Sequence, residues 1–225
     1  MSSAEAIKFY GNPICPFAHR AWWTAKEKEV PIEFIHIELG DKKPAWYAQE
    51  VNPRGTVPAI KAGDHVVLES LIVSEFFEDA YAEQGTSLLP KDALLRADIR
   101  LFIDQFGQVL PVFYGLLRNQ DREKDEELKK QILDKLHPLL ELLKKQSEEG
   151  PFFLGQQLSL ADTAVLPFIE RFSVVLKHYR GFDLLEVDPR LKRWLEAARE
   201  RPAFQETTRE PEFFIEGYAK YANPQ

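Results

Sequence analysis

The spacing of apolar residues changes once along this chain of 225 residues, and that change constrains the fold most. Up to about residue 82, short strand-like runs alternate with helix-like segments. Beyond residue 92, the apolar residues recur every three or four positions, as they do on a helix face. We therefore expect an α/β unit over residues 1–84, a linker over 85–92 and an all-helical unit over 93–225.

The first part is typical of a small sheet with helices in the order βαβαββα. Strand-like residues at Ile7–Tyr10 and Ile32–Glu38 flank a helical segment from Pro16 to Glu29, so the first two strands should run parallel. Ala62-Gly63-Asp64 separates two further apolar runs and indicates a hairpin. A helix from Ser70 to Tyr81 completes the pattern.

The second part contains several amphipathic helices. One apolar face extends from Leu95 to Phe113, and we expect Pro111 to kink that helix. A second helix covers about Leu128–Leu143. A third begins at Ser159, whose hydroxyl can cap the helix while the carboxylate of Asp162 reaches back to form a capping box.

The charge balance excludes several classes of partner. The chain has 29 basic and 36 acidic residues, which give a formal charge of −7 and argue against nucleic acid or anionic lipid. No run approaches 18 apolar residues, and residues 16–40 carry too many charges for membrane insertion. The start, Met1–Ala6, lacks the features of a signal peptide, so we expect a cytoplasmic protein.

The chain has one cysteine, Cys15, and this count excludes internal disulfides and zinc sites built on several thiolates. Four of the five histidines show no metal-ligand spacing, namely His36, His65, His137 and His178. We therefore expect no bound metal.

Cys15 is the most informative residue for function. It follows a strand and a turn and precedes Pro16, which suits the first turn of a helix. A cysteine at this N-terminus meets unpaired backbone NH groups and the positive end of the helix dipole, which favour thiolate over thiol. A lone cysteine is otherwise often a small buried hydrophobe, but this local pattern favours a chemical role.

A second thiol is missing where a dithiol motif would carry it, because position 18 is alanine. A mixed disulfide on Cys15 would therefore need an external thiol to resolve it, so the sequence predicts a small thiol as co-substrate. His19 can share a helix face with Cys15 and bias its pKa, although we expect this histidine to be exposed to solvent.

Two further segments can bind a small ligand. The bond between Val57 and Pro58 stands at a strand entrance, and a cis bond there would expose the Val57 backbone for pairing with an extended peptide. Glu69 and Ser70 begin a helix whose N-terminus suits a carboxylate, and Glu69 can also take an ammonium. Plain helix capping is the alternative for both residues.

Together these residues resemble the cytosolic glutathione transferases, and within them the cysteine-type omega and lambda classes. The resemblance covers nearly the whole chain, and Lys43-Pro-Ala-Trp46 and Gly150-Pro-Phe-Phe-Leu-Gly155 are particularly lambda-like. Its other marks are Cys15-Pro-Phe-Ala18, Asn52-Pro-Arg-Gly-Thr-Val-Pro58, Glu69-Ser70, Ser159-Leu-Ala-Asp162 and Pro167-Phe-Ile-Glu-Arg-Phe172.

The resemblance implies a thioredoxin-like N-terminal domain that binds glutathione and an all-helical C-terminal domain that contributes an acceptor pocket. Cys15 would form the mixed disulfide with glutathione. Val57, before cis-Pro58, would pair with the cysteine backbone of glutathione, and Glu69 with Ser70 would hold its γ-glutamyl end. The remaining implied contacts with glutathione are Lys43 and Phe17.

The acceptor pocket is less defined by the resemblance. Helix placement suggests Phe113, Tyr114, Arg171 and Trp194 as pocket residues, with core packing as the alternative for each. Tyr10 stands where other classes could carry a catalytic tyrosine, but we expect it to be a structural residue of the strand.

The function implied is a glutathione-dependent thiol transferase or reductase that removes glutathione from mixed disulfides and can reduce dehydroascorbate. The expected partners are glutathione and a small hydrophobic or disulfide acceptor, with neither nucleic acid nor membrane, in a monomer or homodimer. The alternative is a carrier with this fold that binds flavonoid- or haem-like ligands and has little turnover.

Overall fold

The computed structural model describes residues 6–223, and these form two compact units. The first, here called the sheet unit, contains the described residues up to Leu88 and also Glu206–Thr208. The second, the helical unit, contains Leu89–Gln205 and the described residues from Arg209 onward. The first five residues, on which the expectation about a signal peptide depends, lie outside the described range.

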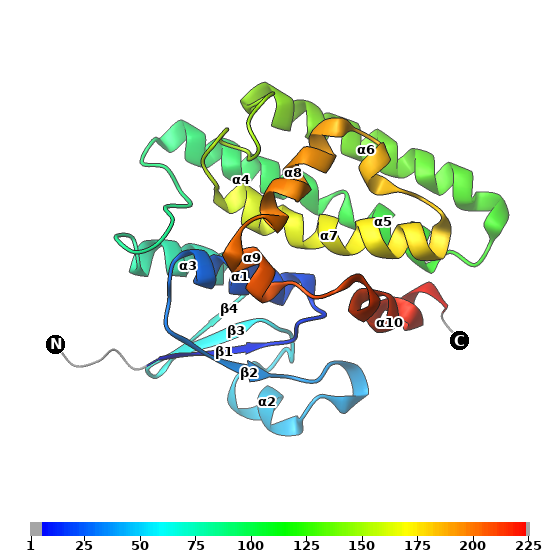
Figure 1. The fold of residues 1–225 in the computed structure, drawn as a ribbon. Coiled ribbons are helices and arrows are strands. Elements are labelled where there is room, and N and C mark those ends of the chain that lie inside the picture. Colours follow the sequence, from blue (N-terminus) through cyan, green and yellow to red (C-terminus); the bar gives the residue numbers. More distant parts are fainter. Residues whose placement is uncertain (1–5, 224–225) are drawn as a thin grey trace. The chain divides into compact units, whose positions relative to one another are not determined.

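The sheet unit has four strands in the order β2-β1-β3-β4 (Figure 1). Strands β1 and β2 are parallel, while β1 with β3 and β3 with β4 are antiparallel, which confirms the expected order βαβαββα and its hairpin. Helices α1 and α3 lie on one face of the sheet and α2 on the other (Figure 1). The bounds are β1 Ile7–Gly11, α1 Pro16–Glu27, β2 Ile32–His36, α2 Ala45–Glu50, β3 Ala59–Ala62, β4 His65–Leu68 and α3 Ser70–Ala80.

Two apolar clusters hold the sheet unit together. The larger one includes Phe9 and Ile60 of the sheet and Phe77 of α3, all fully buried. The smaller one joins Tyr10 and Val57, and Cys15 packs against it. Burial of such side chains is the main favourable term in folding, and here the smaller cluster also fixes the cysteine beside the Val57 segment.

The segment after α3 is tied back to the sheet unit. The Thr86 NH donates to the Glu27 carbonyl at 2.7 Å, and the Leu88 NH donates to the buried carboxylate of Glu78 at 3.2 Å. Lys28, which is also buried, lies 3.2 Å from that carboxylate. These contacts explain why the sheet unit extends to Leu88.

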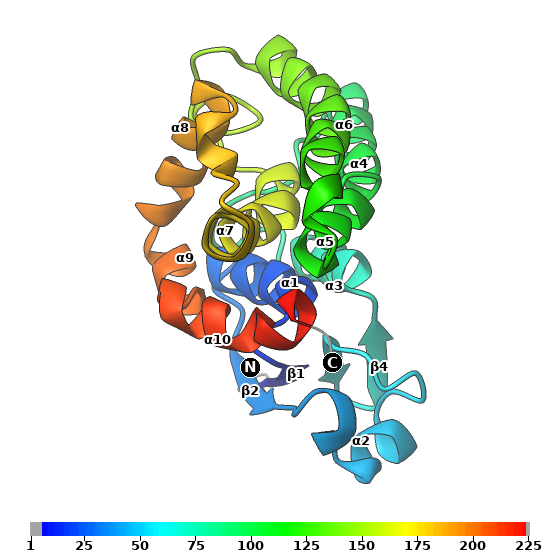
Figure 2. The same ribbon diagram turned by 90° about the vertical axis from the view of Figure 1, so that its right-hand side faces the viewer.

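The helical unit is built around α7, which contacts α4, α5, α8 and α10. Figure 2 views this helix nearly end-on, with α4, α5 and α6 on one side of it. The bounds are α4 Ala93–Gly107, α5 Leu110–Arg118, α6 Asp125–Gln146, α7 Leu160–Arg180, α8 Pro189–Arg199, α9 Pro202–Thr207 and α10 Pro211–Ala222.

The expected capping box at the start of α7 is confirmed. The backbone NH and the hydroxyl of Ser159 both donate to the Asp162 carboxylate at 2.7 Å. The same carboxylate accepts from the Phe153 NH at 2.8 Å and from the Trp194 indole NH at 2.6 Å. Burial raises the pKa of Asp162, while these hydrogen bonds oppose that rise.

The single kinked helix expected from Leu95 to Phe113 is wrong, because the structure has two helices there. Helix α4 ends at Gly107 and α5 begins at Leu110. Pro111 lies in the first turn of α5, where its missing NH removes no helix hydrogen bond. The apolar residues continue across the break because both helices pack against α6 and α7.

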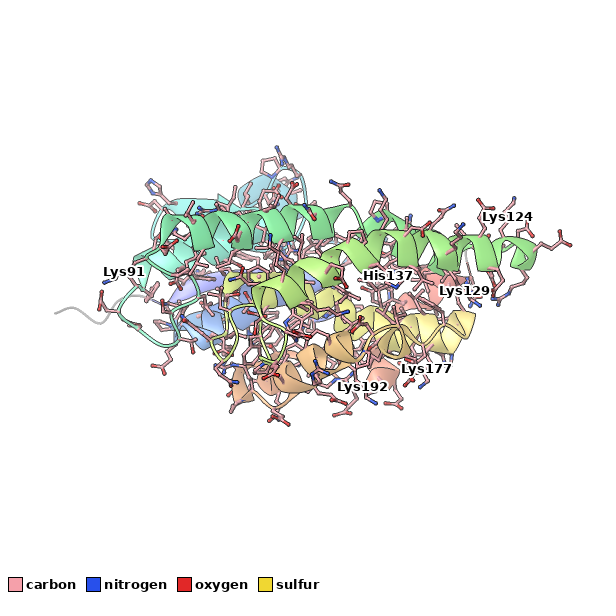
Figure 3. The ribbon with its side chains drawn as sticks, turned by 90° about the horizontal axis from the view of Figure 1, so that it is seen from above. Lys91, Lys124, Lys129, His137, Lys177 and Lys192 are labelled. Atoms are coloured by element: carbon pink, nitrogen blue, oxygen red, sulfur yellow. The ribbon has the colours of Figure 1, made fainter. Side chains whose placement is uncertain are left out.

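The outer surface of the helical unit carries paired charges. Lys124 and Lys129 project from the start of α6 and the turn before it (Figure 3). Their amines lie 3.1 Å from Asp121 and 2.7 Å from Glu126. Over residues 6–223, no helix combines the length and the apolar character that crossing a membrane requires.

Candidate functional site

A cavity of about 430 Å³ lies in the sheet unit and contains Cys15. It brings together all seven residues to which the family resemblance gives a role in binding glutathione or in its reaction. They are Cys15, Phe17, Lys43, Val57, Pro58, Glu69 and Ser70. The structure thus places in one cavity residues that are up to 55 positions apart in the sequence (70 minus 15).

Cys15 occupies the N-cap position of α1, as the sequence predicted. Asn12 holds the preceding turn, because its amide donates to the Ile37 carbonyl at 2.9 Å and its side-chain oxygen accepts from the Ile14 NH at 3.0 Å. The half-buried sulfur lies 3.8 Å from the Val57 carbonyl. Its place at the positive end of a twelve-residue helix favours thiolate.

A buried guanidinium stands behind this cysteine. Arg20 of α1 is 5% exposed, and it donates to the Ser70 hydroxyl at 3.2 Å. Burial lowers the pKa of Arg20 to about 9, while the negative charge of the Cys15 thiolate raises it. At neutral pH the side chain therefore carries a positive charge, which interacts favourably with the Cys15 thiolate.

The Val57–Pro58 bond is cis, which was one of the two forms the sequence allowed. The loop before it is anchored through the Thr56 carbonyl, which accepts from the Tyr47 hydroxyl at 2.7 Å and the Asn52 amide at 2.8 Å. Burial raises the pKa of Tyr47 to about 12, so the hydroxyl keeps its proton. This anchoring fixes the Val57 backbone beside the sulfur.

Glu69 adopts a backbone conformation that non-glycine residues rarely take. Its φ is +67°, and such strain often occurs where a side chain must be held for a ligand. Its carboxylate accepts from the Arg54 guanidinium at 2.8 Å at the exposed edge of the cavity. Ser70, the next residue, is 7% exposed and begins α3.

Lys43 lies against a glycine at the same edge. Gly55 has a φ of +64°, and a Cβ added there would come 3.0 Å from the Lys43 amine. A side chain at position 55 would therefore displace this amine as well as strain the turn. The edge of the cavity carries two cations, Lys43 and Arg54, and one carboxylate, Glu69.

Three of the four residues suggested for the acceptor pocket are packed in the core of the helical unit. Phe113, Arg171 and Trp194 are fully buried within the helical unit. The ring of Phe113 packs at a tilt against a neighbouring ring, Arg171 donates to the Pro167 carbonyl at 2.7 Å, and the Trp194 indole donates to the capping-box carboxylate of Asp162. Side chains without exposed surface cannot line an open pocket of this unit. Tyr114 is half-buried.

The prediction of an exposed His19 is also wrong. The imidazole is fully buried, and its Nε2 lies 3.0 Å from the Thr207 hydroxyl. Tyr10 packs against Trp46 and Tyr47, which fits the structural role expected of it.

Sequence reasoning missed several residues of the cavity. Arg54 contributes a positive charge at the cavity edge, and Leu39 and Thr56 form part of the cavity wall. Arg20 does not line the cavity but donates to Ser70, which does. Arg54 stands inside the Asn52–Pro58 motif, so its place in that motif was an available signal. Arg20 had one weaker signal, namely a charged residue in the mostly apolar first half of α1.

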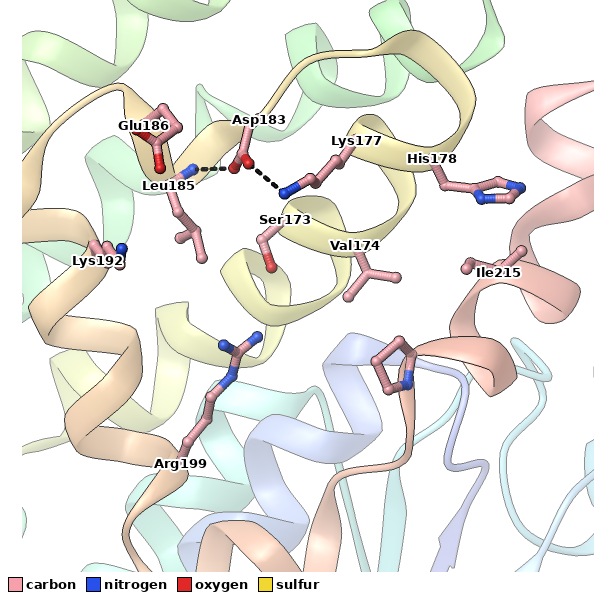
Figure 4. A pocket seen from close by; sticks show the side chains of 11 residues that line it. Ser173, Val174, Lys177, His178, Asp183, Leu185, Glu186, Lys192, Arg199 and Ile215 are labelled. Atoms are coloured by element: carbon pink, nitrogen blue, oxygen red, sulfur yellow. Dashed lines mark hydrogen bonds and ion pairs between the residues drawn. The ribbon is translucent and has the colours of Figure 1, made fainter.

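The helical unit has a second cavity of about 460 Å³, beside α7, α8 and α10 (Figure 4). Its main charges pair with neighbouring side chains. The Lys177 amine points toward Asp183 at 2.6 Å, and Arg199 lies 2.8 Å from Glu170. Within residues 6–223, no cluster of three metal-ligating side chains occurs in either unit.

Sequence comparison identifies related proteins for both parts of the chain. The family model for the glutathione S-transferase N-terminal domain matches residues 9–85, and the model for the C-terminal domain matches residues 97–207. Glutathione S-transferase L3 of Arabidopsis thaliana is 31% identical over 218 residues, which cover 95% of this chain and 86% of the relative. Glutathione S-transferase DHAR3 of the same plant is 26% identical over 204 residues, covering 91% and 72%.

Solved structures give the same relationship. The trimeric glutathione transferase TDR1 of Leishmania superposes with a TM-score of 0.91 at 31% identity, over 98% of this chain. The chain spans about half of that protein, 48% of its length. Glutathione transferase Omega 3C of Trametes versicolor has a TM-score of 0.85 at 31% identity, over 96% of this chain and 90% of the relative.

The family models, the sequence relatives and the solved structures all agree with the thioredoxin-like sheet and the separate helical unit described above. The chain belongs to the glutathione S-transferase family.

Proposed function

We propose that this protein is a cysteine-type glutathione transferase that removes glutathione from mixed disulfides through Cys15. Membership of the family, with L3 and DHAR3 among the relatives, supports glutathione-dependent thiol transfer or reduction in general. The observation that carries the finer proposal is the cysteine at the N-cap of α1 inside the cavity, beside the Val57 carbonyl and a buried arginine.

The charges of the cavity suit glutathione, which has two carboxylates and one ammonium group. Glu69 would take the γ-glutamyl ammonium, and Ser70 would donate to the neighbouring carboxylate. Lys43 would attract the glycyl carboxylate from across the cavity edge. The Val57 backbone would pair with the cysteinyl residue, as an extended peptide adds to a sheet edge, and Phe17 would cover the sulfur.

The reaction proceeds in two thiol–disulfide exchanges. The Cys15 thiolate attacks the glutathione sulfur of the substrate, a new disulfide to Cys15 forms, and the substrate leaves as a thiolate that takes a proton from solvent. The thiolate of a second glutathione then attacks the glutathionyl sulfur on Cys15. Oxidised glutathione leaves and Cys15 returns to a thiolate, so one mixed disulfide is reduced by one free glutathione, and the other half of the oxidised glutathione comes from the substrate.

Dehydroascorbate is a second acceptor in this proposal. It would accept two electrons and two protons while two glutathione molecules become oxidised glutathione, again through Cys15. The similarity to DHAR3 supports this acceptor. In the same proposal, the domain of residues 1–84 binds glutathione and the domain of residues 93–225 supplies the acceptor pocket. Residues 85–92 connect the two domains. A cytoplasmic location fits, because a reducing compartment maintains the glutathione pool.

An activity panel tests the proposal. Wild type and Cys15→Ser would be assayed with glutathione and four acceptors: a glutathione mixed disulfide of a small thiol, dehydroascorbate, a phenacyl-glutathione and a chlorinated aromatic. We expect the wild type to reduce the first three without conjugating the fourth, and Cys15→Ser to lose at least a hundredfold, roughly the contribution of a nucleophile. Full activity of Cys15→Ser would contradict the mechanism, and binding of flavonoid- or haem-like ligands without any turnover would favour a carrier.

A further inference from the structure

Arg20 stands behind the wall of the Cys15 cavity. It lies on α1, five positions after the cysteine, and its guanidinium donates to the Ser70 hydroxyl at 3.2 Å. The guanidinium carbon is also 5.6 Å from the ring centre of Phe17. Cys15, Phe17 and Ser70 all line the cavity. Arg20 therefore interacts with three lining residues, although it does not line the cavity itself.

The guanidinium of Arg20 lies over the ring of Phe17, two residues along α1 from Cys15, and its charge interacts with that of the thiolate. Moving a guanidinium from water into the protein is unfavourable, and this burial lowers the pKa of Arg20, while the Cys15 thiolate raises it. Coulombic attraction is mutual, so the guanidinium favours the thiolate at Cys15. This effect adds to that of the helix N-terminus described above.

The hydrogen bond to Ser70 has a direction that matters for binding. A guanidinium can only donate, so the Ser70 oxygen accepts from Arg20. The single hydrogen of that hydroxyl is then left to donate to another group. In the nearly buried position of Ser70, the group that this hydrogen suits best is an anionic acceptor such as a ligand carboxylate.

We propose that Arg20 is a positioning residue with two effects at the site: it stabilises the Cys15 thiolate, and it orients the Ser70 hydroxyl as a donor to a ligand carboxylate. The second effect rests on the proposed function, because glutathione supplies that carboxylate. One side chain thus couples the reactive sulfur on α1 to the ligand-binding end of α3.

The test separates the two effects with three variants. Arg20→Met keeps much of the apolar bulk without charge or donor, Arg20→Lys keeps the charge without the fork of donors, and Ser70→Ala removes the hydroxyl. In each ligand-free protein, the rate of Cys15 alkylation by iodoacetamide is followed against pH. Because the chain has one cysteine, the midpoint of that curve reports Cys15 alone. Glutathione affinity is measured by calorimetry.

The variants should give distinct pairs of results. Arg20→Met should raise the alkylation midpoint by about one to two pH units and weaken glutathione binding about tenfold. Arg20→Lys should keep the midpoint within about half a unit and still weaken binding several-fold, because a point charge replaces the planar fork. Ser70→Ala should weaken binding about tenfold with the wild-type midpoint.

A folded Arg20→Met protein with either the wild-type midpoint or the wild-type affinity overturns the proposal. If that variant does not fold, Arg20→Lys decides, and wild-type affinity in the lysine protein overturns it. A wild-type protein that does not bind glutathione would contradict the proposed function instead. The alkylation midpoints need no ligand, so they test the charge effect in either case.

Discussion

The two units bury arginine side chains for different purposes. In the helical unit, Arg190 is 2% exposed and donates only to backbone carbonyls among its described bonds. The three carbonyls, at 3.0–3.2 Å, belong to Ser147, Pro151 and Phe152. In the sheet unit, Arg20 is 5% exposed and donates to a side-chain hydroxyl on a cavity wall.

One arginine contributes to stability and the other to reactivity. Carbonyls after a helix end and in a loop lack regular partners, and a buried guanidinium that satisfies several of them holds the loop in place. A guanidinium beside a thiolate and a cavity hydroxyl changes chemistry instead. Variants of the helical core should therefore lower the melting temperature and leave the alkylation midpoint of Cys15 unchanged. Variants of the cavity should change that midpoint or the glutathione affinity and have little effect on the melting temperature.

Asp162→Ala should have the largest effect on stability. The carboxylate is fully buried and accepts four hydrogen bonds, two of them from Ser159, so its loss leaves several buried donors without a partner. We expect a loss of about 4 kcal/mol and a drop in melting temperature of about 10 °C. Glu196→Ala, an exposed carboxylate on α8, is the matched control. A drop no larger than that of the control would contradict this role.

Arg190→Met should have the next largest effect, a loss of about 3 kcal/mol by thermal or urea unfolding, because three carbonyls in buried or partly buried surroundings each lose a hydrogen bond. The alkylation midpoint of Cys15 should stay at the wild-type value. Lys192→Met removes an exposed cation from the same helix and should change neither quantity. A shifted midpoint in Arg190→Met would break the contrast with Arg20.

Glu69→Gln should act on binding and hardly on stability. Its pair with Arg54 is exposed, and exposed ion pairs contribute at most about 1 kcal/mol. Glutamine can still accept from Arg54 but lacks the charge that suits an ammonium, so glutathione affinity should fall about tenfold. Calorimetry on this variant and on Glu50→Gln, an exposed carboxylate of α2, checks the prediction. Equal affinities in both variants would exclude Glu69 from the ligand site.

Substitution of Asp183 should have the smallest effect on stability, and the size of that effect should depend on pH. The hydrogen bond from Lys177 lowers the pKa of Asp183, with a further contribution from the Leu185 NH against the effect of burial (Figure 4). A carboxyl whose pKa is lower in the folded state adds stability above its unfolded pKa of about 3.9, and this is lost as pH falls through the folded value.

Asp183→Asn should therefore lower the melting temperature slightly at pH 7 and have less effect at pH 3. Melting curves at both values measure it, with Glu186→Gln of the same turn as control. A difference between Asp183→Asn and wild type that stays the same at both pH values would show that ionisation of Asp183 is not involved.

Features set by neighbouring residues could be predicted from the sequence. The Cys15-Pro16 pair, the hairpin and the Ser159–Asp162 box all depend on residues within a few positions of each other. The order of elements βαβαββα followed from the alternation of strand-like and helix-like segments along the chain.

Features set by distant residues could not be predicted. His19 is buried, and its imidazole lies within hydrogen-bond distance of Thr207, which is 188 positions later in the sequence. Arg20 donates to Ser70, which is 50 positions later. Phe113 and Trp194 have the same apolar and aromatic character whether they line a pocket or fill a core, and only the packing around them decides.

The intact mass of the protein would reveal the proposed disulfide between Cys15 and glutathione. Wild type would be mixed with a glutathione mixed disulfide in slight excess, quenched in acid and measured by mass spectrometry, before and after addition of reduced glutathione. We expect one glutathionyl group on Cys15, removed by glutathione as oxidised glutathione appears, and no adduct on Cys15→Ser. Turnover of the disulfide without any adduct on the wild type, and at the same rate in Cys15→Ser, would contradict the account.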